Sequence, residues 1–226
     1  ETDFLQAVTL RATSFRRKAF LGSSNDVERA PRVGCRRTDI LQISLDEYLA
    51  HAPEIVKGLI ETSKFLHKQY IFDPKYLPYG TQLIPLSVIF SQLGHASTTM
   101  GSQEKISQWF WNGVMGELYG GTTETRFAHD VQEVIAWVEG GSEVPRTISE
   151  ANLAPGRLLT LRSRNSAAYK GFTALLLADG AKDWRTGDTV NAHTYFDDGI
   201  DIHHVFPKKW CETKNIGPSK YNSILN

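Results

Sequence analysis

Two adjacent histidines near the end of the chain have the types and spacing of a small metal-dependent nuclease site. His203 and His204 follow Asp201 closely and come shortly before Pro207. If residues 200–204 form a strand, side chains alternate between its faces, so the two imidazoles point in opposite directions. One can hold a cation while the other takes a proton from water, because imidazole has a reference pKa of about 6.5. The alternative is an ordinary histidine pair at the end of a strand.

Asp201 lies two residues before His203 and therefore shares its face of the predicted strand. There its carboxylate could ligate the same metal or orient the imidazole from outside the ligand shell, and we favour the supporting role. A magnesium-type cation prefers oxygen ligands and keeps several waters, whereas imidazole also suits manganese, zinc or nickel. The residue types alone leave the identity of the metal open.

The residues that follow the histidine pair favour the nuclease interpretation. Residues 208–211 read Lys-Lys-Trp-Cys, residues 215–219 are rich in turn formers, and Asn226 is the last residue. This stretch resembles the HNH (ββα-metal) nucleases, in which an Asp-His or His-His pair before an apolar-apolar-Pro turn is followed later by an asparagine. We therefore expect a small ββα-metal unit at this end of the chain.

The resemblance implies a role for each of these residues. His204 matches the general base, His203 the first metal ligand, and Asn226 the central asparagine that braces the motif, with Asn222 as the reserve for that position. The implied cofactor is a divalent metal, Mg²⁺ or Mn²⁺. Because the family motif continues past its central asparagine into a helix that supplies the last ligand, we expect the final ligand beyond Asn226.

The resemblance extends upstream to the helical and HNH-bearing C-terminal portion of GmrSD-type proteins. The segments that carry it are residues 77–86, 109–111, 116–121, 125–128 and 161–171. In that bacterial family a ParB-like nucleotide-binding domain precedes the helical region, and several characterised members restrict modified phage DNA. The family's Asp-Gly-Gln-Gln-Arg type of motif is absent, so we expect a fragment of a longer protein. The implied function is that of a DNA endonuclease module in restriction or phage defence, acting on DNA that can carry modified bases.

Net charge gives no general argument for nucleic-acid binding, because 25 basic and 25 acidic residues balance to zero. Any DNA contact must use local groups, and those nearest the predicted site could neutralise phosphates. These candidates are Arg162, Arg164, Lys170, Lys208 and Lys209. The alternative for the first three is that Asn165 caps a helix while the arginines make surface ion pairs.

Two cysteines, Cys35 and Cys211, allow at most one disulfide, and their spacing lacks the paired knuckle of a zinc site. We expect a cytoplasmic protein without membrane contact, because no apolar run approaches a span of about twenty residues. Two rival classes stay open. One is a non-catalytic DNA- or protein-binding helical module with a degenerate HNH segment, and the other is a structural metal-binding domain.

The predicted fold is mainly α, a helical bundle followed by a small, truncated ββα-metal unit. We expect a helical domain over residues 1–178 and the HNH segment, without its final helix, over 179–226. Ser44 and Glu47 form a capping-box pattern, and glycines mark several helix ends. Helices are predicted over residues 45–70, 81–93, 103–118, 125–138 and 165–178. A turn over residues 183–188 and short strands over 190–196 and 200–205 are predicted to follow.

Overall fold

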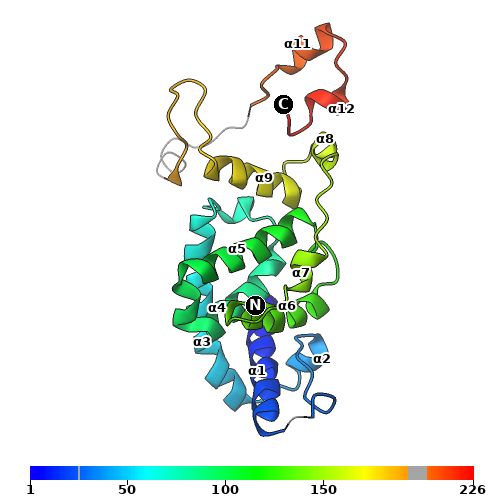
Figure 1. Ribbon diagram of the computed structural model, residues 1–226. Helices are drawn as coiled ribbons and strands as arrows, with labels where there is room; N and C mark the ends of the chain where they lie inside the picture. The colour runs from blue at the N-terminus through cyan, green and yellow to red at the C-terminus, as the bar shows by residue number, and fades with distance from the viewer. Residues whose placement is uncertain (25, 193–202) are drawn as a thin grey trace. The chain divides into compact units, whose positions relative to one another are not determined.

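The computed structural model describes residues 1–24, 26–192 and 203–226, and it is mainly helical, as predicted (Figure 1). Backbone contacts divide the chain into two compact units. The first comprises Glu1–Phe65 and Tyr79–Ala151, and the second Leu66–Pro78 and Asn152–Asn226. The predicted domain boundary after Ala178 stays a prediction. In the described ranges, no helix is both long and apolar enough to cross a membrane.

The first unit contains most of the regular structure. Its elements are α1 (Thr2–Ser23), α2 (Arg37–Ile40), most of α3 (Leu45–Lys68), η2 (Gly80–Gln82), α4 (Leu83–Leu93), η3 (Gly94–Thr98), α5 (Met100–Met115), α6 (Glu124–Val138) and α7 (Arg146–Ser149). α1, α4 and α6 pack on one another, and α5 packs on α6 and α7. The core between them is apolar and includes the fully buried side chains of Leu10, Leu86, Ile106, Trp109, Phe110 and Phe127.

All five predicted helices are present, and local signals set several of their ends. The backbone N–H of Glu47 donates to Ser44 Oγ at 3.2 Å and that of Ser44 to Glu47 Oε2 at 3.0 Å, which is the predicted capping box of α3. α4 ends at Gly94, whose φ of 50° is readily adopted by glycine. The sequence analysis predicts no helix over α1, whose buried face includes Thr9, Arg11 and Thr13 beside its apolar residues.

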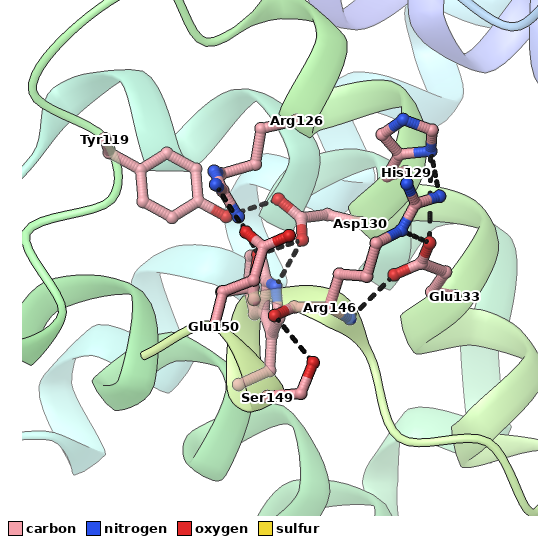
Figure 2. Close-up of polar contacts among 10 residues, drawn as sticks. Tyr119, Arg126, His129, Asp130, Glu133, Arg146, Ser149 and Glu150 are labelled. Carbon is pink, nitrogen blue, oxygen red and sulfur yellow. Dashed lines mark hydrogen bonds and ion pairs between the residues drawn. The ribbon is translucent and has the colours of Figure 1, made fainter. Parts of the chain in front are cut away.

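A buried carboxylate joins three elements of the first unit (Figure 2). Asp130 of α6 is 1% exposed. Its Oδ1 accepts hydrogen bonds from Trp109 Nε1 at 3.0 Å and Thr147 Oγ1 at 2.6 Å, and its Oδ2 accepts one from the Tyr119 hydroxyl. Burial raises the pKa of Asp130, while the three donors oppose that rise. α5, α6 and α7 are therefore held in register around one acceptor group.

The second unit is smaller and has short helices. They are η1 (Pro74–Tyr76), α8 (Arg157–Thr160), α9 (Ala167–Ala178), α11 (Lys208–Thr213) and α12 (Pro218–Tyr221). α9 packs on η1 and α8 on α12. The backbone N–H of Ile224 donates to Leu161 O at 2.8 Å, and Ser223 Oγ donates to Leu158 O at 3.0 Å. These bonds bring the last residues of the chain beside α8.

The predicted ββα unit is not seen in the part of the chain that the structure describes. Residues 190–192 and 203–205, the described parts of the two predicted strands, are not in strands. An isolated antiparallel bridge joins Lys182 and Thr189, across a turn in which Asp183 Oδ1 accepts the backbone N–H groups of Arg185 and Thr186. The predicted turn over residues 183–188 is thus confirmed, and the strands beyond it are not shown.

α3 and α4 approach each other closely at Gly58. A Cβ at this position would lie 2.1 Å from the carbonyl oxygen of Ser87, a backbone atom that cannot rotate away. Gly58→Ala should therefore lower the free energy of unfolding by about 2 kcal/mol or more, as overpacked cores do. Urea denaturation measures this loss. Gly101→Ala, in open space on α5, is the control and should leave stability unchanged or slightly raised.

Asp130→Ala should destabilise the first unit strongly. The substitution leaves buried N–H and O–H groups of Trp109, Tyr119 and Thr147 without their acceptor, so we expect a loss of about 3 kcal/mol or more in urea denaturation. Asp26→Ala, which removes an exposed ion pair with Arg29, should cost less than about 1 kcal/mol. Equal stability of the two variants would contradict the conclusion that Asp130 holds α5, α6 and α7 together.

Candidate functional site

The histidine pair lies on an exposed segment of the second unit, just before α11. His203 and His204 are both exposed, and Pro207 is the residue that precedes the first turn of α11. Proline suits this junction because its fixed φ matches the helix that begins there. Asp201 lies outside the described residues.

Asn226 closes the segment that follows the histidines. Its side-chain Oδ1 accepts the backbone N–H of Phe206 at 2.6 Å, while its Nδ2 donates to Phe206 O at 3.0 Å and Tyr221 O at 2.8 Å. The backbone N–H of Val205 also donates to Asn226 O at 2.6 Å. We call this set of bonds the Asn226 clamp. It lies where the HNH resemblance expects a bracing asparagine, and a catalytic role for Asn226 stays a prediction.

The clamp is supported by the turn into α11. Phe206 and Trp210 stack with ring centroids 5.1 Å apart, and Cys211 Sγ donates to Phe206 O at 3.5 Å. Cys211 is buried, and its thiol therefore serves packing here. Cys35 belongs to the first unit, and burial raises its pKa to about 12. Its thiolate, the form that binds metals, is thereby disfavoured.

The predicted basic residues fall into two groups in the second unit. Lys208 and Lys209 begin α11 directly after the histidine segment, and both are exposed, with Lys208 3.9 Å from Glu212. Lys170 of α9 is half-buried, and its Nζ donates to Leu77 O at 3.3 Å. Lys208 and Lys209 are therefore open to solvent, whereas Lys170 helps to hold the segment that contains Leu77.

Arg162 and Arg164 are exposed between α8 and α9. Leu161, which precedes them, accepts the N–H of Ile224, so this segment lies beside the end of the chain that carries the clamp. The residue that caps α9 is not the one named in the alternative in which these arginines make surface ion pairs. Ser166, not Asn165, is the N-cap of α9, and its Oγ accepts the N–H of Tyr169 at 3.3 Å.

The partners of the clamp could not be predicted from the sequence, because most of them are backbone atoms. Phe206 and Tyr221 contribute peptide groups to Asn226, and any residue type other than proline offers the same groups. The spacing between the proline turn and Asn226 was the only available signal. No sequence signal indicated the hydrogen bonds from Ser223 and Ile224 to α8 and the residue that follows it.

A divalent-metal site at the histidine pair stays a prediction. Within the described ranges, no group of three or more His, Cys, Asp or Glu side chains is placed to hold a metal ion. His203 and His204 supply imidazoles at an exposed turn, and Asp201 is the further donor that the sequence offers. Cations such as Mg²⁺ are commonly bound through one or two protein groups, with water filling the other positions.

Comparison with known proteins gives one distant relative. The chain is 28% identical over 156 residues to the uncharacterized protein MJ0686 of Methanocaldococcus jannaschii, a match that covers 67% of this chain and 25% of that protein. The chain thus spans about a quarter of its relative's length. No family model matches the chain, and no solved structure matches it. The resemblance to GmrSD-type and HNH proteins stays a prediction.

Asn226→Ala should loosen the segment after the histidines. Loss of three side-chain hydrogen bonds should speed amide exchange at Phe206 by roughly tenfold or more, because each bond contributes about 1 kcal/mol. Hydrogen exchange followed by NMR measures this rate. Asn222→Ala is the matched control, since its side chain is exposed and makes no hydrogen bond within the described chain. Unchanged exchange at Phe206 would show that the clamp does not hold the segment.

Proposed function

We propose that this chain is a metal-dependent DNA endonuclease module of the HNH type, part of a restriction or phage-defence protein. The proposal includes a longer polypeptide with a ParB-like nucleotide-binding domain on the N-terminal side, and DNA, plain or modified, as the substrate. The observation that carries it is the Asn226 clamp, because it joins the end of the chain to the peptide that directly follows the histidine pair.

The clamp supports the proposal through geometry. A general base must lie within hydrogen-bond reach of the attacking water, and a small misplacement costs much of the rate. The clamp binds both backbone polar groups of Phe206, two residues after His204. A backbone fixed from both sides limits the positions open to the imidazole of His204.

In the proposed reaction, each group of the site has a separate task. His204 takes the proton from the attacking water, and His203, with Asp201 as ligand or orienting partner, holds the divalent cation. That cation, when bound, supplies positive charge to the phosphate and the leaving oxygen. Lys208 and Lys209 contact neighbouring phosphates, and their exposure on the first turn of α11 supports this task.

His204→Ala should abolish cleavage without unfolding the protein. We expect a loss of about 10²-fold or more in the rate of supercoiled-plasmid cleavage, because a general base contributes that much. The assay uses the full native polypeptide with Mg²⁺ or Mn²⁺, on plain and on base-modified DNA. Removal of the metal by a chelator should stop cleavage in the same way.

His95→Ala is the matched control, since His95 is an exposed histidine of η3 in the first unit. It should cleave at the wild-type rate. Cleavage that survives His204→Ala would exclude that residue as the base. No cleavage by the folded, metal-supplied wild-type protein on either DNA would favour a non-catalytic binding module.

A further inference from the structure

A hollow of about 500 Å³ in the first unit is lined by arginines that lie far apart in the sequence. Arg17 comes from α1, Arg32 and Arg36 from the segment between α1 and α2, and Arg146 from the start of α7. Small-molecule sites commonly have volumes of about 300–1,000 Å³. The size is therefore that of a ligand pocket, and the four arginines of the lining outnumber its two glutamates, Glu124 and Glu133.

Two of the four arginines are already neutralised. Arg146 donates from Nε to Glu133 Oε1 at 2.6 Å and from its backbone N to Oε2 at 2.8 Å (Figure 2). Arg32 Nη2 lies 3.2 Å from Asp39 Oδ1. In each pair the carboxylate neutralises the arginine, so Arg146 and Arg32 offer a ligand little net positive charge.

The guanidinium groups of the other two arginines bond only neutral groups. Arg17 Nη1 donates to Ala30 O and Pro31 O, both at 3.2 Å, and Arg36 Nη2 donates to Thr125 Oγ1 at 2.9 Å. Neither pairs with a carboxylate in the part of the chain that the structure describes. Their guanidinium groups are thus held in position by neutral acceptors while their positive charges stay uncompensated by contact.

Hydrogen bonds fix the backbone of the loop that carries Arg36. Asp39 Oδ2 accepts the backbone N–H of Arg36 at 2.8 Å, and Gly34 N–H donates to Thr13 Oγ1 at 3.1 Å. A Cβ on Gly34 would lie 2.6 Å from Asp39 Oδ2, so the absence of a side chain there lets the carboxylate approach. The pocket wall is anchored to α1 on one side and to α2 on the other.

His129 also lines the pocket, and its Nδ1 lies 2.6 Å from Arg146 Nη2 (Figure 2). Since a guanidinium can only donate, Nδ1 is the acceptor and the imidazole proton lies on Nε2. Arginine forks and an imidazole N–H are the donors that suit the oxygens of a phosphate group.

We propose that this arginine-lined pocket binds a phosphate-bearing ligand, with Arg17 and Arg36 supplying the charge. A nucleotide and a nucleic-acid backbone share this chemistry. All of the residues belong to the first unit, so the proposal does not depend on the histidine site or on any nuclease activity.

Isothermal titration calorimetry on the full native polypeptide tests the proposal at constant ionic strength. The probes are inorganic pyrophosphate, a nucleoside triphosphate and a short DNA duplex. Arg17→Gln and Arg36→Gln should each weaken binding by roughly tenfold, the effect of losing one hydrogen bond to a charged group. Glu124→Gln, which removes an acidic group from the lining, should instead strengthen binding by roughly threefold.

Arg29→Gln is the control, because Arg29 is an exposed arginine of the same region that pairs with Asp26 and is not part of the lining. It should bind like the wild type. Effects confined to pyrophosphate and nucleotide would identify a small ligand, and effects confined to the duplex would identify a DNA backbone.

Two results would overturn the proposal. One is that no probe binds, and the other is binding that is indifferent to Arg36→Gln and Glu124→Gln. Thermal melting accompanies each titration. If Arg17→Gln unfolds the protein by releasing the carbonyls of Ala30 and Pro31, the other two variants still decide the question, because they change binding in opposite directions.

Discussion

The first unit depends on one buried carboxylate. Moving an ionised group out of water is costly unless hydrogen bonds replace its hydration, and Asp130 receives three such bonds from three different segments. Few other positions of these segments are favourable, because each donor would be buried without an acceptor if its segment moved. The positions of Trp109, Tyr119 and Thr147 therefore depend on one another, and so do those of α5, the turn after it and α7.

The wall of the arginine-lined pocket follows from the same carboxylate. His129 precedes Asp130 in the chain, and Arg146 precedes Thr147, so fixing Asp130 against Thr147 places their neighbours on the adjoining surface. Figure 2 shows the Asp130 bonds and the Glu133–Arg146 pair next to each other. Asp130 is buried, whereas the Arg146 side chain is exposed. The buried bond between Asp130 and Thr147 thus helps to position His129 and Arg146 on the surface.

Helix ends were predictable where the signal is local. The capping box at Ser44 and the glycine after α4 act within a few residues, and the structure places both as expected. α1 was missed because a one-dimensional pattern cannot show that Arg11 is buried with partners from other helices. One of these is Ser91, which accepts from Arg11 Nε.

The candidate site was predictable only in part. A short apolar run before a proline can be a strand or an irregular segment, and periodicity does not separate the two. The bracing contacts around Asn226 follow the spacing of the motif, whereas the partners on α8 depend on tertiary contacts. The sequence gives no sign that the arginines share one pocket, because Arg36 and Thr125 meet across 89 residues of chain.

The Asn226 clamp differs from an ion pair in its response to acid. Asn226 joins residues 20 positions apart through a neutral amide, so closing this loop involves no group that gains or loses a proton. An ion pair in its place would weaken near the pKa of its acid partner. The bonds that hold the segment after His204 therefore contain no group that an acid solution would neutralise.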